Sequence, residues 1–139
     1  KDQVETFKTT LYDEAVADYN VPKIYLYEPN AAILKSGAFH SLAIHFNLKK
    51  LAENTHLYTS ENLIEFPGRR FEIESVLPYN KKEMRTYTKS KANITIRNFP
   101  ETVAQIRKKW KIKDGGNDYL FFTSLETSER VVISGKPIR

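Results

Sequence analysis

The chain has 139 residues, of which 40% are apolar and 12% aromatic, so it can bury one modest hydrophobic core or two small stacked cores. It contains no cysteine, which excludes a disulfide framework and a thiolate metal site and favours the cytosol as its location. No apolar run approaches the roughly 20 residues that a membrane-spanning helix needs, so we expect a cytoplasmic protein without a membrane partner.

The net charge of +5 is distributed unevenly along the chain. Residues 1–65 contain six lysines and nine acidic residues, a net charge of −3, whereas residues 66–139 contain 16 basic and eight acidic residues, a net charge of +8. Every arginine lies in the second part. Such a block of cations raises the local concentration of a polyanion, although net charge does not specify a sequence.

The first part begins with weak structural signals. A loose alternation of apolar and polar residues predicts a strand over residues 3–11, and the acidic segment 13–18 predicts a short helix. Residues 21–27 are rich in β-branched and aromatic side chains and lead into Pro29, which cannot donate a hydrogen bond to a neighbouring strand. This pattern predicts a strand that runs into a turn.

A longer helix is expected next. Asn30 is a suitable N-cap for a helix over residues 31–47, whose apolar residues recur at helical spacing and which Gly37 weakens in its interior. A short strand over residues 56–59 completes this part. The turn sequence Phe66-Pro67-Gly68 coincides with the change of charge, so we place a subdomain boundary near residue 65.

The second part has clearer patterns. Residues 92–99 alternate cleanly between apolar and polar side chains, which indicates a sheet with one solvated face. The segment after Pro100 has Val103, Ile106 and Trp110 at helical spacing, so we assign Trp110 to the core and not to a base-stacking platform. The predicted order is β-α-β-α-β-β: a strand over 70–77, a helix over 80–91, a strand over 92–99, a helix from Pro100 that ends at Gly115-Gly116, and a hairpin of strands 119–125 and 130–134.

These patterns predict an α+β chain of two small sheet-and-helix units, residues 1–65 and 66–139. The segment Glu28-Pro29-Asn30 is similar to the substrate-amine clamp of amino-methyltransferases, but that clamp needs two prolines followed by an aromatic residue. A strand exit followed by a helix cap explains the segment better. A nucleotide-binding turn would need glycines after a strand, whereas Gly115-Gly116 follows a predicted helix.

Metal-binding and acid–base residues are also scarce. His40 and His45 are five residues apart, which is not the spacing of a helical zinc pair, and His56 has no acidic neighbour at ligand spacing. Glu72 and Glu74 share one face of a predicted strand, where a solvated surface is the simpler interpretation. We therefore expect no catalytic, cofactor-binding or metal-binding residues in this chain.

The basic residues of the second part are the strongest functional signal. They occur on both predicted helices and on the polar face of a strand, where they could follow a phosphate backbone. The alternative is that solvated helices are simply rich in lysine. The residues expected to contact RNA are Lys81, Lys82, Arg85, Lys89, Lys91, Arg97, Arg107, Lys108, Lys109, Lys111 and Lys113.

Five ordered blocks between about Lys23 and Ile133 carry a family resemblance: YLYEPNAAILKSGAF, THLYTS, FPGRRFEIESVLPYNKK, ANITIRNFPETVAQIRKKWKIKDGG and DYLFFTSL. The chain resembles the C-terminal region of bacterial class I SAM-dependent methyltransferase-like proteins that end in a THUMP-like domain. The resemblance implies a preceding Rossmann-type methyltransferase domain that binds SAM, then a small ferredoxin-like piece and a THUMP-like unit. THUMP domains proper bind RNA and present it to an attached modifying enzyme.

Because the chain begins at Lys1 instead of Met, we expect it to be part of a longer protein, although tag removal or processing would give the same start. We expect a non-catalytic, RNA-binding accessory region whose partners are RNA and the methyltransferase domain of the same protein. One alternative is a structural module that packs on that domain or dimerises through the acidic first part. Another is that this region completes the active site, with Glu28 and Asn30 as the first residues to test.

Overall fold

The computed structural model describes residues 21–37 and 39–139, so the strand and helix expected over residues 3–11 and 13–18 lie outside the described residues. The strands are β1 (Tyr25–Pro29), β2 (Lys49–Ala52), β3 (Thr55–Ser60), β4 (Gly68–Pro78), β5 (Lys91–Arg97), β6 (Lys113–Ser124) and β7 (Arg130–Ile138). The helices are α2 (Ala31–Ser36), α3 (Phe39–His45), the 3-10 helix η1 (Glu83–Thr86) and α4 (Val103–Trp110). The chain is α+β, as the sequence predicts.

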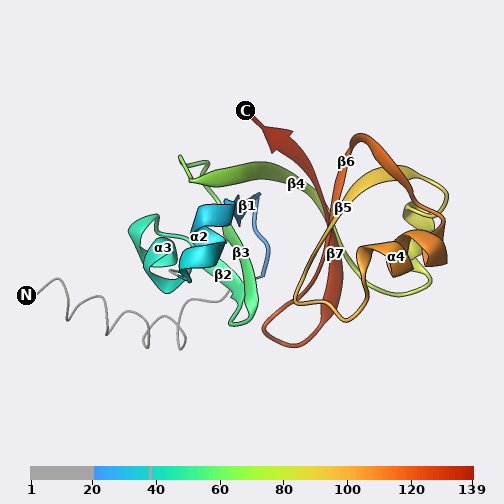
Figure 1. The fold of residues 1–139 in the computed structure, drawn as a ribbon, viewed down its shortest axis with the longest axis horizontal. Helices are drawn as coiled ribbons and strands as arrows, with labels where there is room; N and C mark the ends of the chain where they lie inside the picture. Colours follow the sequence, from blue (N-terminus) through green and yellow to red (C-terminus); the bar gives the residue numbers. More distant parts are fainter. Residues whose placement is uncertain (1–20, 38) are drawn as a thin grey trace, which may run out of the picture.

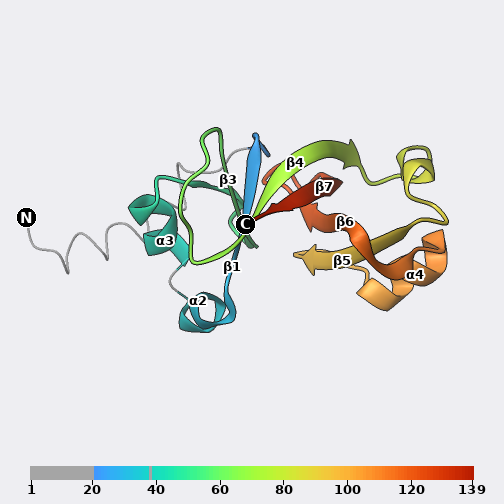
Figure 2. The same ribbon diagram turned by 90° about the horizontal axis from the view of Figure 1, so that it is seen from above.

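The strands of both parts form one continuous seven-stranded sheet in the order β2-β3-β1-β4-β7-β6-β5. Only the β5–β6 pair of this sheet is parallel. Strand β4 joins the two parts, because it pairs with β1 on one side and with β7 on the other. Figure 1 shows β4 running from the region of α2 and α3 towards the region of α4, and Figure 2 shows these helices at opposite ends of the molecule.

Gly68 marks the start of β4, where the chain enters the second part. It pairs with Pro29 of β1, and a Cβ atom at this position would collide with the carbonyl oxygen of Glu28. The turn Phe66-Pro67-Gly68 is therefore followed at once by a strand that both parts share, and glycine is needed for the close approach of the two backbones.

The predicted helix over residues 31–47 is divided into α2 and α3. Asn30 caps α2 as expected, because its Oδ1 accepts a hydrogen bond from the backbone N–H of Ile33 at 3.0 Å. Gly37 then adopts a left-handed conformation with φ of 71° and ends α2. Strand β2 was not predicted, because its sequence KKLA does not alternate, and it forms only by pairing with β3.

The predicted helix over residues 80–91 is wrong, since this segment contains only the short helix η1. Asn80 does cap it, accepting a hydrogen bond from the N–H of Glu83 at 2.8 Å. Met84 is the single buried residue of η1, so a longer helix would have no continuous apolar face to bury. Lys89 has a φ of 66°, which places it outside helical geometry.

Helix α4 begins with a capping box, in which Thr102 and Gln105 each accept a hydrogen bond from the other's backbone N–H. The predicted end at Gly115-Gly116 is wrong, because Lys111 is the left-handed residue that terminates the helix. The two glycines lie in β6 at a register shift, where the amide of Asn93 donates to the carbonyl of Gly116 at 3.0 Å.

Buried residues form three clusters. The central cluster combines residues from both parts of the chain: Leu26, Leu51 and Leu57 with Phe71, Phe121, Leu125, Val131 and Ile133. A second cluster, Met84, Ala92, Ile106, Ile112, Leu120, Phe122 and Val132, lies under α4 on the opposite face of β6 and β7. A third, Tyr27, Leu42, Ala43, Leu48 and Tyr58, lies under α3. The two parts therefore share the central cluster.

Candidate nucleic-acid interface

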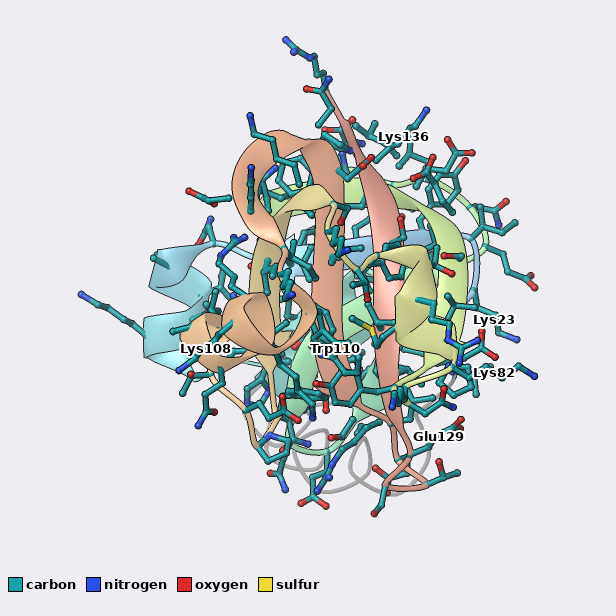
Figure 3. The ribbon with its side chains drawn as sticks, turned by 90° about the vertical axis from the view of Figure 1, so that its right-hand side faces the viewer. Lys23, Lys82, Lys108, Trp110, Glu129 and Lys136 are labelled. Carbon is teal, nitrogen blue, oxygen red and sulfur yellow. The ribbon has the colours of Figure 1, made fainter. Side chains whose placement is uncertain are left out.

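The C-terminal end of α4 and the segment that follows β4 lie against each other. The N–H of Lys89 donates to the carbonyl of Trp110 at 3.0 Å, and the N–H of Lys113 donates to the carbonyl of Ser90 at 2.9 Å. Two basic segments that are separate in the sequence are thus joined through their backbones. Figure 3 shows this end of the molecule, with Lys82 and Lys108 on either side of Trp110.

Nine of the eleven predicted RNA-contacting residues are exposed on these adjoining segments and on the starts of β5 and β6. We call this set the basic end face: Lys81, Lys82, Arg85, Lys89, Lys91, Lys108, Lys109, Lys111 and Lys113. Lys108 and Lys109 lie in the last turn of α4, where positive charge also stabilises the negative end of the helix dipole.

Arg107 has a structural role in the same region. Its Nη2 lies 3.0 Å from Oδ1 of Asp114, and its Nη1 donates to the carbonyl oxygens of Ala92 at 3.1 Å and Ile112 at 3.3 Å. This guanidinium therefore links α4 to the first residues of β5 and β6. It holds the basic end face together instead of projecting from it.

Arg97 lies apart from the basic end face and pairs with the buried carboxylate of Glu28. Its Nη2 is 2.6 Å from Oε2 of Glu28, and Nε of Arg69 is 2.6 Å from Oε1 of the same carboxylate. Both oxygens of Glu28 are thus occupied. This ion pair was missed at the level of sequence, because its partners are 41 and 69 residues away from Glu28.

The interpretation of Glu28-Pro29-Asn30 as a strand exit and helix cap is correct. Pro29 is the last residue of β1, and Asn30 caps α2. Glu28 and Asn30 border a hollow of about 320 Å³ that Arg69 and Arg97 also line. Since the carboxylate and the amide oxygen are already engaged, neither is placed to hold a substrate nitrogen.

An open depression of about 370 Å³ lies within the basic end face and is lined by Tyr79, Asn80, Lys81, Lys109 and Trp110. The indole Nε1 of Trp110 donates to the phenol oxygen of Tyr79 at 3.0 Å, and that phenol donates to Oε1 of Glu101 at 2.7 Å. Burial raises the pKa of Tyr79 to about 12, so the phenol stays protonated at neutral pH. Trp110 packs against the second cluster as predicted, but it is only partly buried and also lines the depression.

Lys109 lies over both rings of this depression. Its Nζ is 5.2 Å from the ring centroid of Trp110 and 5.6 Å from that of Tyr79, which is within the range of a cation–π contact. The same Nζ is 3.6 Å from Oε2 of Glu101. The depression therefore combines two aromatic rings, an asparagine and two lysines, and Lys109 partly neutralises the neighbouring carboxylate of Glu101.

Among the side chains that the structure describes, the other candidate residues do not assemble into a site. No three His, Asp or Glu side chains come together to hold a metal ion in the described residues. Glu72 and Glu74 are exposed on β4, and Glu74 lies 3.6 Å from Nζ of Lys136. None of the helices in residues 21–37 and 39–139 is long and apolar enough to cross a membrane.

Comparisons with known proteins agree with this architecture. No curated protein matches the chain. Among solved structures, it is similar to a Porphyromonas gingivalis W83 protein described as a "putative methyltransferase", with 34% sequence identity and a TM-score of 0.82. The match covers 89% of this chain and 32% of that one, so the chain spans about a third of its relative's length. Residues 25–67 match a ferredoxin-like domain family and residues 68–137 match the THUMP domain-like family, so the chain belongs to the THUMP domain-like family.

Proposed function

We propose that this chain is the RNA-binding accessory region of a SAM-dependent RNA methyltransferase, and that its basic end face contacts the RNA. The observation that carries the proposal is the convergence of exposed cations from separate segments on one end of a THUMP-like domain. THUMP domains proper are RNA-binding modules. The similarity to a "putative methyltransferase" supports the class of the parent protein.

In this proposal the chain positions the RNA and another domain carries out the chemistry. The lysines would contact phosphates, which fixes the orientation of the RNA without specifying its sequence. A catalytic domain of the same protein would bind SAM, the methyl donor. The match covers only 32% of the Porphyromonas protein, which leaves room for such a domain in that protein. In this proposal the protein is located in the cytosol, where it acts on cellular RNA.

The proposal is tested by titrating a labelled RNA hairpin with the full chain at several salt concentrations. Phosphate contacts release counterions, so the logarithm of the affinity should fall linearly as the logarithm of the salt concentration rises. A Lys82→Gln/Lys108→Gln double variant should flatten this slope by roughly 1.5, because each phosphate contact contributes about 0.7–0.9. Lys136→Gln, on β7 away from Trp110 in Figure 3, is the matched control. Absence of binding at low salt, or binding that salt does not weaken, would contradict the proposal.

A second candidate function is a structural module that docks on another domain or dimerises. It is favoured by apolar side chains that remain exposed near the start of the described chain, Val21 at 53% and Ile24 at 48%. Val21 also shares a depression of about 350 Å³ with Val76 and Pro78 of β4. Sedimentation equilibrium of the full chain tests this candidate, since a dimer that Val76→Ser dissociates would support it.

Completion of an active site by Glu28 and Asn30 has less support. The carboxylate of Glu28 already binds two arginines, and the side chain of Asn30 caps α2. Both side chains would have to give up these interactions before they could act on a substrate.

A further inference from the structure

We propose that the depression lined by Tyr79 and Trp110 binds an unpaired nucleobase of single-stranded RNA, with the adjoining lysines on its phosphates. This inference rests on the proposed RNA binding and makes it more specific. It assigns the end face to RNA that carries an unpaired nucleotide, and not to the continuous surface of a duplex.

The two rings are already held in a fixed arrangement. Trp110 is oriented by the bond from its Nε1 to the phenol of Tyr79 at 3.0 Å. Tyr79 is fixed in turn by Glu101 and by edge-to-face contacts with Phe99, at 5.0 Å and 76°, and with Phe122, at 5.6 Å and 88°. A rigid aromatic surface loses little conformational entropy when a ligand stacks on it.

The contact of Lys109 with both rings shows that their faces are accessible from the depression. A base that stacks there would take the place of the ammonium group, which could move on its flexible side chain to a neighbouring phosphate. Base stacking on an aromatic side chain is generally stronger than an exposed cation–π contact, so the exchange is favourable.

The positive charges around the depression suit the phosphates next to a bound base. Lys81 and Lys109 line it directly, and Lys82 and Lys108 lie on either side of Trp110 (Figure 3). Glu101 does not line the depression, but its carboxylate accepts a hydrogen bond from Tyr79 and lies 3.6 Å from Nζ of Lys109. The surroundings of the rings therefore favour the phosphates on both sides of a bound base.

The geometry favours an unpaired base over a duplex. In an A-form helix the faces of the bases are stacked on each other, and only their edges and the backbone are accessible to a protein. A base can cover the indole only after it leaves such a stack. At about 370 Å³, the depression is at the small end of the range for ligand sites, about 300–1,000 Å³, which suits one planar ring.

Trp110 is the single tryptophan of the chain, so its fluorescence reports directly on this depression. The full chain is titrated with a short fluorescein-labelled oligoadenylate and, separately, with a blunt RNA duplex of equal length. Binding is followed by the anisotropy of the label. We expect the single strand to quench the emission of Trp110 over the same concentration range in which its anisotropy rises, and the duplex to raise anisotropy without quenching.

The outcomes separate the two proposals. If the single strand binds by anisotropy while the Trp110 emission stays constant, the depression does not bind the base and this inference is overturned, although RNA binding stands. Equal quenching by the duplex would also overturn it. If neither RNA binds at low salt, the proposed function fails, and this inference fails with it.

Variants provide an independent measurement. Trp110→Leu should weaken binding of the single strand by about tenfold and leave duplex binding unchanged, since a stacked base contributes roughly that factor. Because Trp110 also packs against the second cluster, Lys81→Gln is a variant at the surface that should fold normally. It should weaken single-strand binding a few-fold, whereas Lys136→Gln should not. Unchanged binding by Lys81→Gln and by a folded Trp110→Leu would count against the site.

Discussion

The carboxylate of Glu28 lies where the first and second parts of the chain meet, between Arg69 of β4 and Arg97 of β5. Glu28→Gln should lower the free energy of unfolding by about 1–3 kcal/mol, because it removes the charge that compensates two arginines. Urea denaturation measures this change. Glu72→Gln is the matched control, because Glu72 is exposed on β4, and its effect should stay within about 0.5 kcal/mol. Equal effects of the two substitutions would show that the ion pair is not needed for stability.

Lys50 is a fully buried cation on β2 whose Nζ donates to the carbonyl of Glu53 at 2.8 Å. Burial lowers its pKa to about 8, although Glu53 and Glu126 act in the opposite direction. Between pH 8 and the ordinary lysine pKa of 10.5, the unfolded chain binds more protons than the folded chain, so this group makes stability rise with pH. Below pH 8 Lys50 is protonated in both the folded and the unfolded chain, so the folded protein bears the full free-energy cost of burying the charge.

Lys50→Met should therefore stabilise the protein at pH 7 by on the order of 2 kcal/mol and remove this pH dependence. The measurement is the difference in unfolding free energy between variant and parent from pH 7 to pH 10.5, which should shrink as the pH rises. A difference that stays constant with pH would contradict the assigned cause.

Helix α4 is the element that presents Lys108, Lys109 and Trp110, and the capping box of Thr102 fixes its first turn. Thr102→Ala should destabilise the protein by about 1 kcal/mol, because the side chain no longer accepts a hydrogen bond from the N–H of Gln105. Thermal unfolding monitored by circular dichroism measures the change. Thr86→Ala, at the exposed end of η1, is the control and should have little effect. If Thr102→Ala and Thr86→Ala had the same melting temperature, the capping box would not contribute to stability.

At the same scale, the errors of sequence prediction have identifiable causes. The segment 80–91 has an N-cap and many helix-forming residues, but only Met84 is fully buried in η1 and Tyr87 is partly buried, so tertiary packing does not extend the helix. Strand β2 lacks a strand-like pattern and exists because β3 supplies its hydrogen bonds. Gly115-Gly116 suits a helix end by composition, but Lys111 had already ended the helix.

At the scale of the whole molecule, the shared core predicts that the two parts depend on each other. A chain truncated to residues 68–139 would expose Phe71, Phe121 and Ile133, which normally pack against Leu26 and Leu57. We expect this piece to unfold with low cooperativity and to bind the dye ANS, whereas the full chain unfolds in one transition. A cooperative transition and dispersed amide NMR signals from the piece alone would show instead that the second part folds independently.

The sequence by itself determined the α+β class, the cap at Asn30, the start of the closing hairpin and the concentration of cations after residue 65, because these depend on local periodicity, turn chemistry and composition. Only the tertiary structure decided that one sheet joins both parts, that Arg97 and Arg107 serve ion pairs, and that Tyr79 and Trp110 line a depression together. These features arise from contacts between residues far apart in the chain, and no local pattern encodes which distant side chain will lie opposite.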